Sequence, residues 1–228
     1  MTIRSSWSLF DVERSKCLAS LIPSTPSTAY ALDLGCGLGL MTEIVGKKGY
    51  TYVGLDISKN ALLKAHESNS TDYVHFLQGD VDSLPLKRLF KLVIALEIIE
   101  HLQDPRNLLV AINKVLLDNG YLVISTPNRV SLEGFKGKME EIILKKRWNA
   151  WNMEHKYIFS SFEFLSLFDE NFSLIQVLGY YFLPKIASER FEQKWWFGRH
   201  LRFLNTHQWP LSFLGFQTIA LLKKVRVN

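Results

Sequence analysis

The sequence has few cysteines and no long apolar run, and each absence excludes a class of protein. Two cysteines among 228 residues, Cys17 and Cys36, are too few for a disulfide framework or a cysteine-rich zinc site, so we expect a reducing, cytoplasmic location. No apolar run approaches the ~18–20 residues that span a bilayer. The opening MTIRSSWSLFDVER lacks the apolar core of a secretory signal. We therefore expect neither a secreted nor an integral-membrane protein.

Acidic residues are scarce in the C-terminal stretch. Residues 185–228 carry eight Lys or Arg against two acids, whereas residues 1–184 carry 19 basic and 20 acidic side chains. The net charge of +5 therefore comes from the C-terminal stretch, which also holds three tryptophans. This composition is typical of a solvated surface. It also fits peripheral contact through 185–226 with a membrane surface, an anionic substrate or, third in order, a nucleic acid.

Apolar periodicity alternates between strand-like and helix-like segments over the first 128 residues. An amphipathic helix is predicted over 7–22, and Ser58 is predicted to cap another. A third helix is expected to open at Asp104–Pro105 and to end at Asn119–Gly120. The predicted strands cover 30–34, 50–55, 74–78, 91–96 and 121–125. Strands that alternate with helices predict an α/β fold, with a parallel sheet covered on both faces.

The remaining sequence departs from this alternation. Residues 160–171 indicate a helix, and no helical period joins the two strands predicted after it, so we expect an antiparallel final pair. Those strands cover 174–182 and 216–225. Two insertions are too long for simple connections, and we expect them to cover a ligand crevice. The predicted organisation is one domain, 1–228, with a lead-in helix (1–29), a cofactor-binding half (30–128) and a substrate-side half (129–228) that includes insertions 129–157 and 184–214.

A glycine loop follows the first predicted strand. Gly35, Gly37 and Gly39 lack a Cβ, which allows a tight turn and close approach of a ligand to the next helix. The spacing is G-x-G-x-G, so the dinucleotide-binding fingerprint fails, and no G-K-[ST] follows to make a phosphate loop. The loop alone does not identify the ligand.

Three acids at successive strand ends narrow the choice. Asp33 precedes the glycine loop, Asp56 closes the second strand and Asp80 follows the third. A carboxylate at the first position suits a ligand with ammonium and sulfonium charge better than a pyrophosphate. An acid at the second position suits ribose hydroxyls. The pattern predicts a site for a cationic nucleoside.

Five further motifs follow one another along the chain: LDLGCGLG (32–39), YVGLDIS (52–58), GDVDSLP (79–85), LVIALEIIEHLQDP (92–105) and NGYLVISTPN (119–128). In order and spacing they resemble the class I S-adenosylmethionine-dependent methyltransferases. The sequence is most similar to the type 11/type 23 small-molecule branch, which includes the ubiquinone-biosynthesis O-methyltransferases. This resemblance implies a Rossmann-like, seven-stranded, mostly parallel sheet with an antiparallel last strand. It also implies S-adenosylmethionine as cofactor and S-adenosylhomocysteine as product.

The resemblance also implies which residues hold the cofactor. Asp33 and the backbone of 35–39 would hold the methionine part, and Asp56 the ribose. Ile57 would pack on the adenine, whose edge Asp80 and Val81 would contact, and Ala95–Glu97 would line the sulfonium side. The full implied set is Asp33, Leu34, Gly35, Cys36, Gly37, Gly39, Asp56, Ile57, Asp80, Val81, Ala95, Leu96 and Glu97.

Candidate catalytic residues follow the fourth predicted strand. Methyl transfer to a hydroxyl needs an aligned acceptor and a base. Glu97, Glu100 and His101 would share one face if this turn is helical. His101 is the preferred base, with Glu97 and the more distant His155 as further candidates. In the ubiquinone-type relatives the same E-x-x-E-H run is associated with a divalent metal, which we do not predict here.

The sequence therefore predicts a methyltransferase acting on a small molecule, by O-methylation of a hydroxyl on a hydrophobic or anionic acceptor. The tryptophans of the insertions suit either the core of a cap or a flat apolar acceptor. One alternative is a nucleic-acid methyltransferase, which only the basic C-terminal stretch supports. Another is a non-catalytic relative that binds the cofactor and acts as a partner protein. A nicotinamide dehydrogenase is disfavoured by the loop spacing and by Asp33.

Overall fold

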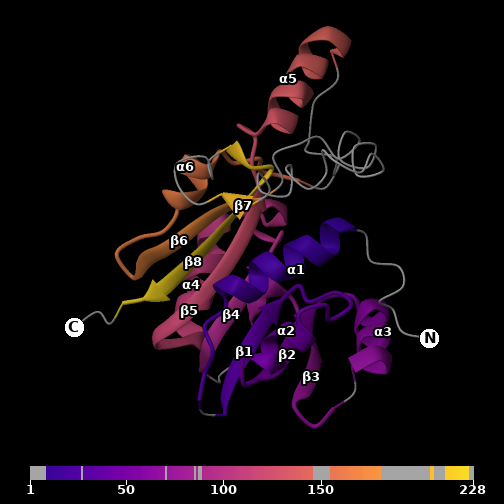
Figure 1. Cartoon of the computed structure of the whole chain (residues 1–228), viewed down its shortest axis with the longest axis vertical. Helices are drawn as coiled ribbons and strands as arrows, with labels where there is room; N and C mark the ends of the chain where they lie inside the picture. The colour runs from indigo at the N-terminus through magenta and orange to yellow at the C-terminus, as the bar shows by residue number, and fades with distance from the viewer. Residues whose placement is uncertain are drawn as a thin grey trace, which may run out of the picture.

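The computed structural model describes most of the chain, and eight strands form one sheet in the order β3-β2-β1-β4-β5-β8-β6-β7 (Figure 1). The described residues are 9–26, 28–69, 71–84, 86, 89–145, 155–180, 206–207 and 214–225. The strands are β1 (Ala29–Leu34), β2 (Tyr50–Asp56), β3 (Val74–Gln78), β4 (Phe90–Leu96), β5 (Leu116–Pro127), β6 (Phe172–Tyr180), β7 (Thr206–His207) and β8 (Gln217–Lys224).

The first five strands are parallel, as predicted, and the end of the sheet is antiparallel. β8 lies between β5 and β6 and is antiparallel to both. Seven strands have five or more residues, and the two-residue β7 pairs with the outer edge of β6. The predicted fold class is therefore confirmed, including the antiparallel last strand.

Helices cover both faces of the sheet (Figure 1). They are α1 (Leu9–Leu21), α2 (Thr42–Lys47), α3 (Lys59–Asn69), α4 (Pro105–Val115), α5 (Leu132–Leu144) and α6 (Ser161–Leu165), with the 3-10 turns η2 (Val81–Ser83) and η3 (Ile99–His101). Successive residues of a strand point to opposite faces. Ala31 accordingly packs with Leu18 of α1, whereas Leu32 packs with Leu108 of α4. Both strand residues are fully buried because each face has its own helix layer.

Two predicted helix ends are wrong. The helix that opens at Asp104–Pro105 has the expected aspartate cap, but it ends at Val115. Asn119 instead lies inside β5 in the left-handed conformation, where the ladder with β4 is irregular. Asparagine tolerates that conformation, so Asn–Gly here marks a bulge within a strand and not a helix end. The predicted helix over 160–171 has a Ser160 capping box, but only its first turn is helical.

The two insertions are described in part. Within 129–157 the structure describes α5 and the return of the chain from His155, and Trp148 and Trp151 lie outside the described residues. Most of 184–214, with its basic residues and tryptophans, also lies outside them. Among the described helices, none has the length and apolar character that would cross a bilayer.

Candidate functional site

The glycine loop between β1 and α2 is held by the carboxylate of Asp56. Gly35, Gly37 and Gly39 all have positive φ, at 64°, 50° and 70°. One oxygen of Asp56 accepts a hydrogen bond from the Gly37 N–H at 2.8 Å, and the other accepts from the Ser58 N–H at 2.8 Å. A carboxylate that accepts two backbone N–H bonds is firmly oriented. The loop and the end of β2 therefore form one unit.

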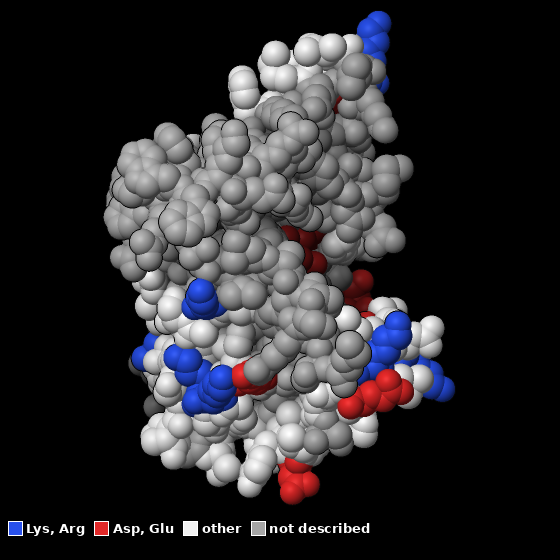
Figure 2. Space-filling view, turned by 45° about the vertical axis from the view of Figure 1, so that its right-hand side comes forward, with Lys and Arg blue, Asp and Glu red and all other residues white. Residues whose placement is uncertain are grey.

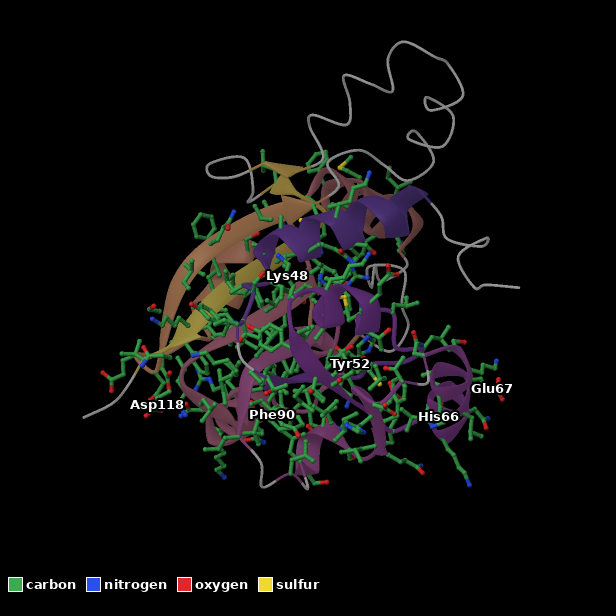
Figure 3. All side chains as sticks on the ribbon, turned by 60° about the horizontal axis from the view of Figure 1, so that its bottom comes forward. Lys48, Tyr52, His66, Glu67, Phe90 and Asp118 are labelled. Atoms are coloured by element: carbon green, nitrogen blue, oxygen red, sulfur yellow. The ribbon has the colours of Figure 1, made fainter. Side chains whose placement is uncertain are left out.

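Asp33 lies beneath this loop, not on its surface. Its side chain is only 3% exposed and accepts a hydrogen bond of 2.6 Å from the Tyr52 hydroxyl. Tyr52 lies in the interior of the molecule, whereas His66 and Glu67 of α3 lie on its outside (Figure 3). Burial raises the pKa of the Asp33 carboxyl to about 7, although the Tyr52 hydrogen bond works against this rise.

The other residues implied for the cofactor differ in exposure. Ile57 is 67% exposed at the edge of the sheet, and Asp80 caps η2 by accepting from the Asp82 N–H at 2.9 Å. Leu34 and Ala95 are fully buried in the core, so only their backbone can face a ligand. Three more implied residues are buried or partly buried: Cys36, Val81 and Leu96.

The turn after β4 is not α-helical, so the condition for a shared face of Glu97, Glu100 and His101 is not met. Glu97 has φ of 57°, in the left-handed region, and only Ile99–His101 form a 3-10 turn. The Glu97 side chain accepts a hydrogen bond of 2.7 Å from the Ser125 hydroxyl of β5. A strained residue at the end of a parallel strand is typical of a functional site. Ile98, the next residue, packs directly against Gly35, so this turn adjoins the glycine loop.

Glu100 is fully buried at this turn. One carboxyl oxygen accepts from the Thr126 hydroxyl at 3.3 Å, and the other has no hydrogen-bond partner within the described residues. Burial and the nearby Glu97 raise the pKa of Glu100 to about 9. Burial also raises the pKa of Glu97. Figure 2 shows acidic side chains recessed near the middle of one face, with both acidic and basic side chains elsewhere on the same face.

His155 joins this cluster from a distant part of the sequence. The backbone carbonyl of Glu100 accepts from the N–H groups of Lys156 and Tyr157, at 2.8 and 3.1 Å. These bonds bring the His155 ring to 4.7 Å from the His101 ring, edge to face, and its Nε2 to 4.0 Å from a Glu100 oxygen. The predicted candidates His101, Glu97 and His155 therefore lie together, and Glu100 lies between them.

The same cluster has the donor set of a metal site. One ligand atom from each of Glu100, His101 and His155 lies within 4.8 Å of the others. A carboxylate with two imidazoles suits a divalent ion such as zinc. The buried carboxyl oxygen without a hydrogen-bond partner fits the same use. The metal association of the E-x-x-E-H run would thus involve His155 here, since Glu97 bonds to Ser125 instead.

Sequence reasoning missed Arg14 of α1. Its side-chain Nε is buried and without a hydrogen-bond partner within the described residues. Its positive charge lowers the pKa values of Asp33, Glu97 and Glu100, against the effect of burial. The charge of Arg14 therefore acts both on Asp33, beneath the glycine loop, and on the two glutamates after β4. The sequence predicts that Arg14 lies on a helix over 7–22, but no local motif indicates that it belongs to the site.

Comparisons with known proteins identify the family of this chain. The family model described as a methyltransferase domain, of type 23, matches residues 13–177. The ubiquinone biosynthesis O-methyltransferase of Schizosaccharomyces pombe is 32% identical over 106 residues, which are 44% of this chain and 39% of that protein. The enzyme of the same name from Glaesserella parasuis is 26% identical over 67% of this chain and 69% of its own length. The chain thus spans about two fifths of the S. pombe relative.

Solved structures share the fold. A Thermotoga maritima S-adenosylmethionine-dependent methyltransferase, titled a possible histamine N-methyltransferase, has a TM-score of 0.67 at 16% identity, over 94% of this chain and 89% of its own. The N-methyltransferase NodS of Bradyrhizobium japonicum, in complex with S-adenosylhomocysteine, has a TM-score of 0.65 at 13% identity, over 98% and 92%. The predicted cofactor is confirmed by the family match. The chain belongs to the methyltransferase domain family of type 23, within the class I S-adenosylmethionine-dependent methyltransferases.

Proposed function

We propose that this protein transfers a methyl group from S-adenosylmethionine to a hydroxyl of a small hydrophobic or anionic molecule. The observation that carries the proposal is the His101–His155 pair, whose rings are 4.7 Å apart beside the glycine loop. Imidazoles can accept the proton that a hydroxyl must lose. The names of the S. pombe and G. parasuis relatives, both O-methyltransferases, support the same acceptor atom.

The reaction is a displacement at the methyl carbon. The acceptor oxygen forms a bond to this carbon while the carbon–sulfur bond breaks, and the electron pair stays on sulfur. The products are the methyl ether, S-adenosylhomocysteine and a proton. The protein aligns the oxygen, carbon and sulfur atoms and receives the proton.

We assign the proton to His101. Both histidines are partly buried, and His101 lies on the turn that adjoins the glycine loop through Ile98. His155 then acts as a positioning residue, fixed by the two backbone bonds to the Glu100 carbonyl. If Glu100, His101 and His155 instead hold a divalent ion, the His101 nitrogen that binds the ion cannot take the proton, and the charge of the ion would favour the ionised form of an acceptor hydroxyl in its place.

We assign the cofactor's methionine end to the space between α1 and the glycine loop. Arg14 offers a cation to the methionine carboxylate, whereas Asp33 and Glu97 offer carboxyl oxygens to the ammonium and sulfonium groups, whose positive charge would favour the ionised form of both carboxyls. We assign the ribose to Asp56 and the adenine to Ile57, because Asp56 is a half-buried acceptor at the end of β2 and Ile57 is an exposed apolar side chain.

The test is transfer of an isotopically labelled methyl group to paired small acceptors. A catechol and its amine counterpart, each with and without a hydrocarbon chain, separate oxygen from nitrogen and apolar from polar acceptors. We expect labelled ether from the apolar catechol. His101→Gln should lower kcat by about 100-fold, because a general base contributes roughly that much. His155→Gln should lower kcat less and should change its pH profile.

His66→Gln is the matched control, because His66 is on α3 and does not belong to the group of Glu100, His101 and His155. Treatment with a chelator, followed by addition of zinc or magnesium, tests the metal. Labelled amine with no labelled ether would overturn O-methylation. An unchanged kcat in both His101→Gln and His155→Gln would overturn the assignment of the base.

A further inference from the structure

Gln217 is a buried polar residue beside the candidate site. It is the first residue of β8 and is only 4% exposed. The sheet pairs it with Pro127 of β5 on one side and with Tyr180 of β6 on the other. Directly before it, the Phe216 carbonyl accepts from the Asn128 N–H at 2.7 Å. The backbone at Gln217 is therefore held from both sides, and so is the point at which its side chain leaves the sheet.

The two ends of the Gln217 amide have different surroundings. Burial raises the pKa of the Glu97 carboxyl, and hydrogen bonds from Ser125 and Gln217 work against this rise. The bond from Gln217 uses the amide N–H, because an ionised carboxyl only accepts. The amide oxygen Oε1 is buried and has no hydrogen-bond partner within the described residues. Buried acceptors are nearly always paired, so this oxygen is a candidate for contact with a bound molecule.

Neighbouring buried side chains at this end of β5 and β8 have partners. Ser125 and Thr126 donate to the two glutamates after β4, at 2.7 and 3.3 Å. The Thr218 hydroxyl shares a hydrogen bond of 2.6 Å with the Ser161 hydroxyl. Gln217 differs from these neighbours, because its acceptor atom is not used by the described part of the protein.

The strand order places Gln217 on the acceptor side of the cofactor. The glycine loop follows β1, and the sheet continues from β1 through β4 and β5 to β8 (Figure 1). Neighbouring strands lie about 4.8 Å apart, so β8 is about 14 Å from β1 and about 10 Å from β4. Glu97, which we assign to the sulfonium side of the cofactor, follows β4, and Gln217 approaches it from the side opposite β1. A molecule that receives the methyl group beside Glu97 therefore comes within reach of the Gln217 amide.

We propose that Gln217 selects the methyl acceptor: its amide oxygen accepts a hydrogen bond from an O–H or N–H group of the acceptor other than the hydroxyl that is methylated. The acceptor is then a hydroxyl compound with a second hydrogen-bond donor near the reacting oxygen. Such a site discriminates against analogues that lack the second donor, because the buried protein oxygen is then left unpaired. The inference rests on the proposed function for the identity of the reacting group, and its test does not require turnover.

The test is the binding of catechol, guaiacol and veratrole to the complex of the full chain with S-adenosylhomocysteine. These probes share one ring and carry two hydroxyls, one hydroxyl and none. In the unchanged protein, calorimetry should show at least about tenfold weaker binding for each hydroxyl that is lost, because each loss leaves a buried group unpaired. Gln217→Met keeps the length of the side chain and removes the amide. In this variant one of the two losses should disappear, so the ratio of the catechol and veratrole affinities should fall about tenfold.

The matched control is Gln176→Met, which makes the same change on β6, opposite Leu221 and away from the edge of the sheet that carries the site. It should keep the affinity ratio of the unchanged protein. Gln217→Met should change the affinity for S-adenosylhomocysteine less than the affinity for catechol. Thermal unfolding checks that each variant is folded, and Gln217→Asn, which draws the amide back by one methylene, replaces Gln217→Met if that variant unfolds.

The outcomes separate this inference from the proposed function. Equal affinity ratios in Gln217→Met and in the unchanged protein would overturn the inference, as would the absence of catechol binding. An equal loss of affinity for S-adenosylhomocysteine and for catechol would also overturn it and would assign Gln217 to the cofactor. Methyl transfer to oxygen with equal ratios overturns only this inference, whereas a lower ratio without methyl transfer to oxygen overturns only the proposed function.

Discussion

The acidic side chains in the two halves of the site differ in their hydrogen-bond donors and in their burial. At the ends of β2 and β3, Asp56 and Asp80 accept from backbone N–H groups near the surface. After β4, Glu97 and Glu100 accept from the hydroxyls of Ser125 and Thr126, and Glu100 is fully buried. The first arrangement orients the carboxylates and shapes the backbone that they bind. The second raises pKa values and favours protonated carboxyls, because neutral hydroxyls offset little of the cost of burying charge.

Carboxylic side chains therefore have two different roles in this site. The acids of the first half organise backbone, and their positions follow from strand ends that the sequence reveals. The acids of the second half depend on hydroxyls of β5 that are 26 and 28 residues away. Substitutions of single residues in each half test whether these two environments have different effects on cofactor affinity and on stability.

The largest effect is expected for Asp56→Ala. This change removes the acceptor of the Gly37 and Ser58 N–H groups and so loosens the loop. Affinity for S-adenosylhomocysteine, measured by calorimetry, should fall by about 100-fold, since two charge-assisted hydrogen bonds are lost. Asp56→Asn keeps an acceptor and should lose less. Wild-type affinity in Asp56→Ala would show that the loop holds its shape without the carboxylate.

Asp33→Asn should stabilise the protein in the absence of cofactor. The folded-state pKa of Asp33, about 7, lies above its ordinary value of 3.8, so stability falls as the pH rises between these values and stays reduced above them. The asparagine still accepts from Tyr52 but carries no charge. Its advantage in the free energy of unfolding should be about 2 kcal/mol larger at pH 8 than at pH 5. A urea titration at both pH values measures this difference, and an equal advantage would show that Asp33 does not titrate there.

Ser125→Ala tests the acids after β4, and we expect a smaller loss of stability from it. The Ser125 hydroxyl donates to Glu97 at 2.7 Å and accepts from its N–H at 3.2 Å. Removing it leaves a half-buried carboxyl with one donor fewer, which should cost about 1 kcal/mol of stability. Ser166→Ala is the control, because the exposed Ser166 hydroxyl donates to a backbone carbonyl at 2.8 Å. Equal melting temperatures for both variants would show that Glu97 does not depend on Ser125.

The smallest effect is expected at the two cysteines. Burial raises the pKa of Cys17 to about 11 and raises that of Cys36 further above its ordinary range. Both thiols should therefore react with a thiol reagent only after unfolding, because the thiolate is the reactive form. Stoichiometric labelling of native protein at pH 8 would contradict this expectation at whichever cysteine reacts.

Local signals in the sequence predicted most of the sheet. The first five strands were placed within a few residues, except that β5 begins five residues early, and Ser58 and Asp104 were recognised as helix caps. The glycine loop and its acids were readable because their spacing follows from strand ends. Asn119 was misread because the same residue types stop a helix or form a bulge, and only the pairing with β4 decides between them.

The rest of the site depends on long-range contacts. Arg14 lies before the first strand, and His155 reaches His101 because the two residues after it donate backbone bonds to Glu100, which is 55 positions earlier in the chain than His155. Backbone hydrogen bonds of this kind have no residue preference, so the sequence carries no signal for them. The sequence also does not reveal that large apolar residues of α5, such as Phe135 and Ile143, are exposed. A helical period shows that a helix has an apolar face but not which way that face points.

The position of β8 has a consequence for how the chain is made. Strands β1 to β5 can pair in the order in which they leave the ribosome, but β6 borders β8, which follows it in the chain. Until β8 emerges, β6 lacks its principal partner and the outer edge of β5 stays open. Nascent chains with open strand edges are prone to aggregate. Synthesis of residues 172–217 is therefore the interval in which this protein most needs a chaperone.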